Sequence, residues 1–316
     1  IWPLSLIYCA FIFLRRKLFQ WHLLKTNYFS APVIVVGNIT VGGTGKTPVV
    51  IALARFLKEK GWRPGIVSRG YGGKIKHFPY QVHQNSNARE VGDEPLLIVR
   101  HTDCPTVIDP NRSRGVRALL KRAHCNLVIS DDGLQHSSLG RNIEIIVVDG
   151  ERRFGNNFCL PAGPLREPTS RLNSVDFVIS KENPLRHEFK LSLIPDHFYQ
   201  LIQPKIKKTL DYFHGKTLHA VAGIGNPDQF FNSLRKLNLK IIEHPFPDHY
   251  LFKPHDFSYG SDAIIIMTEK DAVKCVGFVD ARLWCLNTKT ELDTNLLNTV
   301  LKRVTTLNNN LKSSSG

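Results

Sequence analysis

The residues best suited to chemistry form a glycine-rich turn that ends in a lysine and a threonine. Residues 42–47 read Gly-Gly-Thr-Gly-Lys-Thr, between the β-branched run 33–36 and the apolar run 49–57. A turn between a strand and a helix binds phosphate, because backbone amides and the helix N-terminus converge on the anion. Lys46 would add a full positive charge, and the Thr47 hydroxyl would be a Mg²⁺ ligand. The predicted ligands of a nucleoside triphosphate are Gly42, Gly43, Thr44, Gly45, Lys46 and Thr47.

One position of this turn departs from the usual phosphate-binding pattern. The pattern places a glycine five residues before the Gly-Lys pair, where this chain has Thr40. The clustered glycines at 42, 43 and 45 compensate for that difference. The alternative interpretation is an ordinary glycine-rich turn without a ligand. The context of strand, turn and helix favours the phosphate-binding loop.

A second apolar run ends in two carboxylates. Residues 126–130 are followed by Asp131 and Asp132. In P-loop proteins such a strand lies beside the P-loop strand, and its terminal aspartate holds Mg²⁺ directly or through water. One or both aspartates would complete the metal site, whereas the alternative is a strand that ends in an Asp-Gly turn. Gln135 and His136 follow at once, so an amide and an imidazole are expected near the same strand end.

Two arginines stand at other predicted strand ends. Arg69 opens the flexible loop 69–73, directly after a predicted strand, and Arg112 begins a predicted helix after the strand at 105–108. Loops at the carboxyl ends of strands in an open α/β sheet usually bind ligands. The alternatives are a plain turn at Arg69 and a solvated helix face for the basic residues that follow Arg112.

A mostly parallel sheet would place these side chains together. Strands alternate with helices through residue 183, which predicts a P-loop NTPase-like α/β domain over 26–183 with helices on both faces of the sheet. Residues 184–207 are expected to be extended linker or hinge strands flanked by prolines. A second, smaller α/β domain is expected over 208–306, followed by a disordered tail at 307–316.

Composition limits the functional classes. The chain has 316 residues, 42% of them hydrophobic, which is enough for two domains. Its net charge of +15 favours an anionic partner. The six cysteines form no Cys-x-x-Cys pair, so neither a disulfide framework nor a zinc site is predicted. Because no basic stripe with interleaved aromatic residues and no reader motif occurs, nucleic acid is not expected as a partner.

The first 25 residues predict a helix associated with a membrane. Residues 1–14 are almost entirely apolar, and Arg15, Arg16 and Lys17 follow. Fourteen helical residues would span ~21 Å, which is less than the ~30 Å of a hydrocarbon core. We therefore expect a helix that lies on or dips into one leaflet, with its arginines on anionic headgroups. The alternative is an apolar helix buried against the domain.

An ordered set of motifs resembles one known family, the tetraacyldisaccharide 4′-kinases (lipid A 4′-kinases) of Gram-negative bacteria. The resemblance extends from the N-terminal apolar helix to about residue 275. Each motif alone is weak to moderate, but their order is highly specific. The motifs occupy residues 42–48, 68–71, 92–95, 130–136, 160–168, 246–249 and 268–271.

The resemblance implies an activity and a location. It implies a monotopic enzyme on the cytoplasmic face of the bacterial inner membrane, with residues 26–183 as its kinase domain. The enzyme would transfer the γ-phosphoryl group of ATP, with Mg²⁺, to the 4′-hydroxyl of a tetraacylated glucosamine disaccharide 1-phosphate. This substrate is anionic and lodged in a membrane, so it fits both the positive charge and the apolar helix. The runner-up hypothesis is a membrane-associated P-loop ATPase switch.

The resemblance also implies roles for side chains outside the P-loop. Asp93, paired with His249, would act as the base or orienter for the sugar hydroxyl, and Glu167 would be a third metal carboxylate. Simpler alternatives are a helix N-cap for Asp93 and a turn histidine for His249. The segments 180–183 and 268–271 could each meet adenine, and neither is assigned. The candidates for contact with the sugar or its 1-phosphate are Arg69, Arg112, Gln135 and His136.

Overall fold

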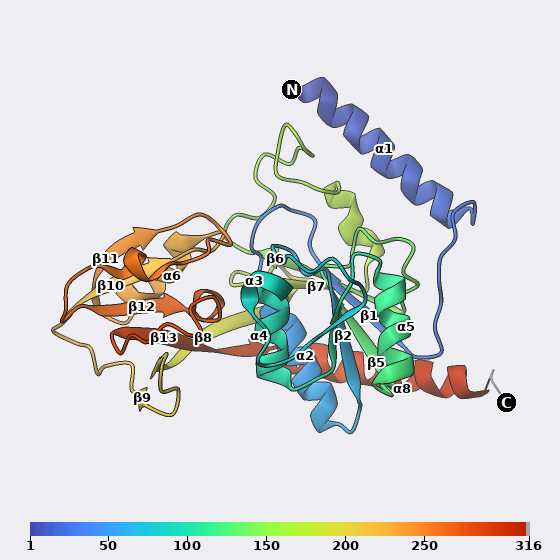
Figure 1. Ribbon diagram of the computed structural model, residues 1–316. Coiled ribbons are helices and arrows are strands. Elements are labelled where there is room, and N and C mark those ends of the chain that lie inside the picture. Colours follow the sequence, from blue (N-terminus) through green and yellow to red (C-terminus); the bar gives the residue numbers. More distant parts are fainter. Residues whose placement is uncertain (314–316) are drawn as a thin grey trace.

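The first part of the chain forms an N-terminal helix and an α/β layer structure. The computed structural model describes residues 1–313 and is shown in Figure 1. Its elements up to residue 181 are α1 (Trp2–Gln20), β1 (Val33–Gly37), α2 (Lys46–Glu59), β2 (Pro64–Ser68), β3 (Tyr80–Val82), α3 (Ala88–Val91), α4 (Asp93–Thr102), β4 (Thr106–Ile108), α5 (Arg112–Arg122), β5 (Leu127–Asp131), β6 (Ile143–Asp149), a 3₁₀ helix (Thr169–Ser174) and β7 (Phe177–Lys181).

The second part continues the same sheet. Its elements are β8 (Phe189–Gln200), β9 (Lys207–Lys208), β10 (Thr217–Ala222), α6 (Pro227–Lys236), β11 (Lys240–Pro245), a 3₁₀ helix (Pro254–Phe257), β12 (Ile264–Thr268), α7 (Glu269–Ala272), β13 (Leu283–Leu292) and α8 (Thr294–Ser313). Within the described residues the sheet has thirteen strands in the order β11-β10-β12-β13-β8-β7-β6-β1-β5-β2-β4-β3, and β9 pairs with β8.

The centre of the sheet confirms the predicted P-loop arrangement. Strand β5 runs parallel to β1, with Val36 opposite Asp131, and β6 lies parallel on the other side of β1. Because β1 is covered on both faces, all five of its residues are buried. Ile34 and Val36 pack with apolar residues of α2, α4 and α8, whereas Val33 and Val35 pack with residues of α5 and α1. The predicted α/β class, with helices on both faces, is confirmed.

A long two-stranded ribbon joins the two parts of the sheet. Strand β8 pairs antiparallel with β13 along nearly the whole length of both strands, and its first residues pair in parallel with the end of β7 (Figure 1). The register shifts between Asn287 and Thr288, and Thr288 lies opposite Pro195. Proline cannot donate a ladder hydrogen bond, so a bulge is where a strand can hold it. The expected linker at 184–207 thus contains one continuous strand, and the division into two domains stays a prediction.

The final helix differs from the prediction in its length and its packing. Residues 307–313 were expected to be disordered, but α8 continues to Ser313; residues 314–316 lie outside the described part. Leu296, Val300 and Val304 are buried in the cluster that contains Val49 and Leu53 of α2, and Leu307 packs against it. Their spacing of four, four and three residues makes one apolar face, which fixes the helix on the P-loop part of the protein.

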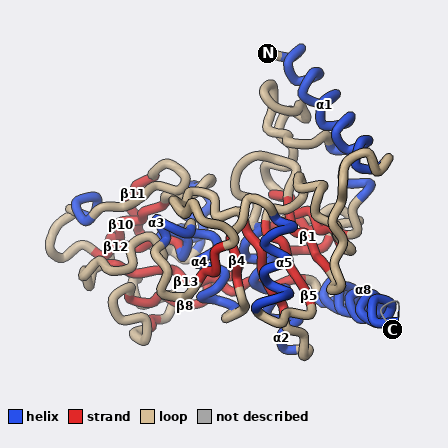
Figure 2. The backbone as a smooth tube through the Cα atoms, turned by 45° about the vertical axis from the view of Figure 1, so that its right-hand side comes forward, coloured by secondary structure: helices blue, strands red, loops and turns tan. Residues whose placement is uncertain are grey.

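Helix α1 lies at one end of the molecule, with its N-terminus beyond the body of the sheet (Figures 1 and 2). Ser5 is the buried residue of this helix, and its hydroxyl donates to the Cys159 carbonyl. On the outer side, Ile7, Phe11 and Leu14 are 67%, 63% and 53% exposed. Among the described helices, none combines the length and apolarity needed to cross a membrane.

Candidate active site

The P-loop has the backbone geometry of an anion site. Gly45 is the N-cap of α2 and has φ of +92°, a left-handed conformation that glycine adopts without the Cβ penalty. The Lys46 ammonium lies 3.6 Å from Asp132 Oδ1. Thr44 is 1% exposed, and its hydroxyl has no hydrogen-bond partner within residues 1–313. A buried unpaired hydroxyl at the head of a helix fits an absent anionic ligand.

Thr40 stands where P-loops usually have glycine because it pairs with another segment. It forms a β-bridge with Leu165, and the Val41 amide donates to the Pro164 carbonyl at 2.8 Å. The Arg166 amide also donates to the Ile39 carbonyl at 2.7 Å. The chain at this position is therefore extended and buried, which suits a β-branched residue. The phosphate cradle begins two residues later, at Gly42.

The two aspartates after β5 occupy different environments. Asp131 is 1% exposed and accepts a hydrogen bond from the Ser68 hydroxyl at 3.1 Å. Its Oδ1 has no hydrogen-bond partner in the described part of the chain. Burial, together with repulsion from Glu94 and Asp132, raises the pKa of Asp131. A buried carboxylate oxygen that lacks a partner beside a P-loop fits a Mg²⁺ ligand.

Asp132 is held by two cations. In addition to Lys46, the Arg166 NH1 group lies 3.3 Å from Asp132 Oδ2. Burial opposes its ionisation, but these two cations outweigh burial and lower the pKa of Asp132. This role of Arg166 was not predicted from the sequence, although the Leu-Arg-Glu-Pro motif contains the residue. Tyr8 of α1 donates to the Arg166 carbonyl at 3.1 Å, so α1 supports the loop that carries this arginine.

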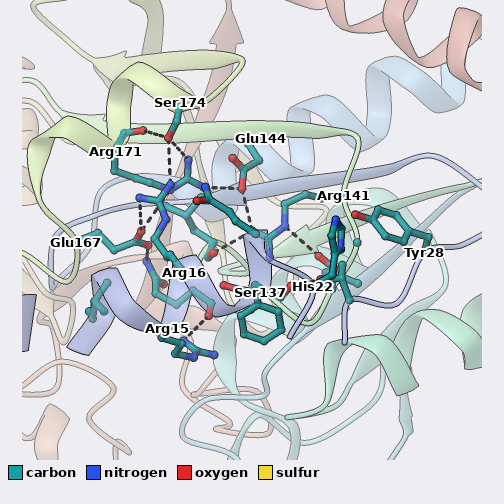
Figure 3. Close-up of a pocket in the computed structure, with 18 residues that line it drawn as sticks. Arg15, Arg16, His22, Tyr28, Ser137, Arg141, Glu144, Glu167, Arg171 and Ser174 are labelled. Carbon is teal, nitrogen blue, oxygen red and sulfur yellow. Dashed lines mark hydrogen bonds and ion pairs between the residues drawn. The ribbon is translucent and has the colours of Figure 1, made fainter. Parts of the chain in front are cut away.

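Glu167 lies among arginines beside α1. Its carboxylate accepts from Gln135 Nε2 at 2.9 Å and lies 3.3 Å from Arg171 Nε and 4.0 Å from Arg16 NH1. Figure 3 shows it facing these arginines in a cavity of about 350 Å³ beside α1. Glu167 is therefore paired with arginines here, and its predicted role as a third metal carboxylate stays a prediction. No group of three or more His, Cys, Asp or Glu side chains within residues 1–313 forms a metal site.

Asp93 and His249 meet although 156 positions separate them in the sequence. His249 Nδ1 lies 3.1 Å from Asp93 Oδ1 and 3.0 Å from Oδ2. Burial would raise the pKa of Asp93, but the His249 hydrogen bond and the Lys270 charge lower it. The hydrogen bond to Asp93 in turn raises the pKa of His249. The two side chains share a small cavity of about 60 Å³ with Tyr71 and Lys274.

Gly92 gives Asp93 its place at the beginning of a helix. One continuous helix was expected from residue 90 to about 101, but the chain breaks at Gly92, where φ is +90°. A Cβ at this position would lie 2.6 Å from the Tyr71 carbonyl oxygen, so only glycine fits. Asp93 is consequently the first residue of α4, and its carboxylate faces His249 of the second part.

Lys270 joins the two parts of the protein at the same place. Its ammonium lies 3.1 Å from Glu94 Oε1, 3.6 Å from Asp248 Oδ1 and 3.9 Å from Asp93 Oδ2. The P-loop also approaches the second part, because a Cβ on Gly225 would lie 3.2 Å from the Gly43 amide nitrogen. The sequence offered Lys270 only as part of a possible adenine site, so its ion pairs were not predicted.

The four predicted substrate contacts lie in different environments. Arg69 is exposed and lines a cavity of about 180 Å³. Arg112 is 1% exposed, and its terminal nitrogens donate to the carbonyls of Asp109 at 2.7 Å and Asp131 at 3.3 Å. Gln135 Nε2 donates to the Asn38 carbonyl at 3.1 Å. Arg112 and Gln135 therefore stabilise the strand ends, and their contacts with a substrate stay predictions.

His136 lies near two of these arginines. Burial, together with the positive charges of Arg112 and Arg69, lowers the pKa of His136 to about 4. Its imidazole is therefore neutral at neutral pH. A neutral ring beside two guanidinium groups can accept a hydrogen bond from a sugar hydroxyl or donate one to a phosphate.

A cavity of about 670 Å³ lies beside the P-loop, between β8 and α6. It is bordered by Lys181 and by Ile224, which is next to Gly225. A Cβ added to Gly45 would lie 3.7 Å from Lys181 Cδ, so the cavity begins beside the P-loop. Both segments considered for adenine reach it, through Lys181 and Glu182 on one side and Thr268 and Glu269 on the other. Its size and its mixed apolar and polar lining suit a small-molecule ligand.

Comparisons with known proteins agree with this geometry. The family model described as tetraacyldisaccharide-1-P 4′-kinase matches residues 1–306. The chain is 50% identical over 285 residues to a tetraacyldisaccharide 4′-kinase of Coxiella burnetii, covering 90% of this chain and 84% of that protein. It is 47% identical over 307 residues to that of Methylobacillus flagellatus, covering 96% and 91%.

A solved structure is similar as well. The crystal structure of the "apo" form of LpxK from Aquifex aeolicus in complex with ATP matches with a TM-score of 0.80 and 29% identity. The match covers 96% of this chain and 98% of that one. The family match over nearly the whole length, the relatives and the shared fold lead to one conclusion: this chain belongs to the tetraacyldisaccharide 4′-kinase family.

Proposed function

We propose that this protein transfers the γ-phosphoryl group of ATP to the 4′-hydroxyl of a tetraacylated glucosamine disaccharide 1-phosphate, a lipid A precursor. The observation that carries the proposal is the Asp93–His249 pair, assembled from two distant segments beside a P-loop in a member of this family. An ATPase switch has the same need for a P-loop and carboxylates, but it has no need of a base for an acceptor hydroxyl.

The P-loop residues 42–47 would hold the β- and γ-phosphates. Lys46 would neutralise the phosphate oxygens that gain charge in the transition state. Arg166 pairs with Asp132, the carboxylate that also pairs with Lys46, and so adds a second positive charge beside it. Mg²⁺ would be held by Thr47 together with Asp131 or Asp132, and it would neutralise phosphate charge when bound. Water and phosphate oxygens would complete its shell, as Mg²⁺ prefers.

Asp93 would act on the acceptor hydroxyl. As the 4′-oxygen attacks the γ-phosphorus, its proton passes to the Asp93 carboxylate, and the bond to the bridging oxygen breaks so that ADP leaves with the electron pair. His249 fixes the orientation of this carboxylate through its Nδ1 hydrogen bond. The pair titrates as a unit, so the proton can reside on either partner afterwards.

The nucleoside of ATP would occupy the 670 Å³ cavity beside the P-loop. The cavity begins next to Gly45 and Ile224, so a nucleotide whose phosphates lie on α2 can extend into it. Leu193 and Phe230 supply apolar walls for a base, while Gln229 and Glu269 supply polar groups. The triphosphate would then bridge the two parts of the sheet.

Helix α1 would bind the anionic surface of the membrane that contains the acceptor. Its outer side exposes Ile7, Phe11 and Leu14, as in interfacial helices. Arg15 and Arg16, which the sequence predicted on anionic headgroups, instead face the domain, where they contact the Gln135 carbonyl and Glu167. ATP is a cytoplasmic substrate, so we infer peripheral association with the cytoplasmic face of the bacterial inner membrane. The acceptor's sugar would then lie level with the end of the sheet that carries the P-loop.

The direct test of the function is transfer from labelled ATP to a panel of glycolipids, followed by location of the new phosphate. We expect a product labelled at the 4′-position of the disaccharide 1-phosphate. Lys46→Ala should lower the rate by at least about 10²-fold, because transition-state charge loses its cation. The exposed Lys60→Ala variant is the control. ATP hydrolysis that is equally fast without any lipid would instead support the ATPase switch.

Removing the base should slow transfer without weakening ATP binding. We expect Asp93→Asn to lower kcat by about 10²- to 10⁴-fold, the usual contribution of a positioned base. KM for ATP should stay near its wild-type value, since Asp93 faces the acceptor. Asp103→Asn, at the other end of α4, should behave as wild type. Equal loss of kcat and of ATP affinity would show that Asp93 is only structural.

Filling the proposed nucleoside cavity should act on ATP alone. Ser233 lines this cavity, so Ser233→Trp should raise KM for ATP about tenfold or more, because the indole occupies the space of the base. KM for the lipid acceptor should not change. Ser233→Ala leaves the cavity open and is the matched control. An unchanged KM for ATP in the tryptophan variant would place the nucleoside elsewhere.

Membrane binding should depend on the outer side of α1. The triple variant Ile7→Ser, Phe11→Ser and Leu14→Ser keeps the Ser5 and Tyr8 contacts but removes apolar surface. Its binding to anionic phospholipid vesicles should fall at least about tenfold in a flotation assay, since each buried apolar side chain contributes about 1.5–3 kcal/mol. A matched variant of α8, Asn295→Ser with Asn298→Ser, should bind as wild type. Unchanged flotation of the triple variant would place the membrane contact on another surface.

A further inference from the structure

Lys270 is surrounded by carboxylates that come from two different parts of the chain. Asp93 and Glu94 belong to the first turn of α4, and Asp248 precedes His249 in the turn after β11. All three carboxylates lie within 4.0 Å of the Lys270 ammonium. The Lys270 side chain is 21% exposed and that of Asp93 is 4% exposed, whereas those of Glu94 and Asp248 are 27% and 35% exposed. Water therefore screens the charge of Asp93 least.

The lysine stands on a rigid support. It belongs to α7, a short helix directly after β12, and the Thr268 hydroxyl accepts from the Asp271 amide at the N-cap of that helix. Asp271 is fully buried, pairs with Lys274 at 2.6 Å, and accepts from the Gly223 amide at 3.0 Å. The backbone of Lys270 is therefore fixed relative to the loop that approaches the P-loop at Gly43.

The charges do not balance without this lysine. Three carboxylates face one another here, and the other nearby cations are His249, when protonated, and Lys274, which is already paired with Asp271. A buried carboxylate such as Asp93 is strongly destabilised when no cation pairs with it. Lys270 thus acts with the His249 hydrogen bond to keep Asp93 ionised next to Glu94 and Asp248.

We propose that Lys270 is a positioning residue for phosphoryl transfer, which holds the Asp93 carboxylate against His249 and fastens the second part of the protein to α4. The inference rests on the proposed role of Asp93. Lys270 itself acts through Asp93 and needs no contact with the acceptor or the nucleotide.

The charge of Lys270 has a consequence for the acidity of the Asp93–His249 pair. It lowers the pKa of Asp93 and also lowers that of His249. Removing it should raise both values, so the pair takes up its inactivating proton at a higher pH. The other titratable groups that face the pair are Glu94 on α4, Asp248 in the turn, Lys274 after α7 and Tyr71 in the loop after β2.

The test is the pH profile of kcat/KM for Lys270→Met and Lys270→Arg, measured with ATP and the lipid acceptor. In Lys270→Met the midpoint of the acidic limb should move up by about 1–2 units, the usual effect of one close opposite charge. On that limb, kcat/KM of Lys270→Met should be about tenfold or more below the wild-type value, and the difference should become smaller at alkaline pH. Lys270→Arg should restore the wild-type midpoint, because it keeps the charge. Lys240→Met, on the exposed edge strand β11, removes one distant positive charge and should leave the profile unchanged.

Several outcomes separate this proposal from the function on which it rests. If Lys270→Met lowers kcat/KM equally at every pH and leaves the midpoint unmoved, the positioning role is overturned. The proposed function still stands in that case, provided that Asp93→Asn is inactive. An active Asp93→Asn variant would instead overturn the function. Should Lys270→Met fail to fold, as judged by its melting curve, Lys270→Gln and Lys270→Arg give the same comparison of midpoints.

Discussion

Buried negative charge must be paired, and this constraint organises the whole site. Four carboxylates crowd the carboxyl ends of the central strands and the beginning of α4: Asp93, Glu94, Asp131 and Asp132. Asp132 pairs with Lys46 from the P-loop and with Arg166 from the long loop, whereas Asp93 and Glu94 share Lys270 from the second part. The charge of Lys46 also acts on Asp131. Asp131 keeps one oxygen without a hydrogen-bond partner within residues 1–313, which is where a metal ion would complete the pairing.

The sheet explains how such distant residues meet. The β8–β13 ribbon connects the two parts (Figure 1). The second part approaches the P-loop at Gly225 and the beginning of α4 at Lys270. Helix α1 takes part as well, because Ser5 and Tyr8 hold the segment that brings Arg166 to Asp132. The same helix therefore joins an exposed apolar surface to the side chain that pairs with Asp132.

Local chemistry could be predicted from the sequence wherever one segment supplies it. Patterns within single stretches predict the P-loop, the position of β5 beside β1 and the α/β class with helices on both faces of the sheet. The Asp93–His249 pair came only from the family resemblance, since no local pattern links residues so far apart. The ion pairs of Glu167 with Arg16 and Arg171 could not be predicted, because they depend on tertiary packing. The ion pairs of Lys270, the break at Gly92 and the extension of α8 depend on contacts that no short stretch specifies.

The central claim is that one site brings the γ-phosphate, the acceptor hydroxyl and Asp93 together. The most direct measurement is a crystal structure of the Asp93→Asn variant with a non-hydrolysable ATP analogue and the disaccharide 1-phosphate. We expect the γ-phosphate at Lys46, with the 4′-hydroxyl between it and the substituted side chain at position 93, within about 3.2 Å of that side chain. A γ-phosphate far from Lys46, or an acceptor whose 4′-hydroxyl points away from position 93, would contradict the account.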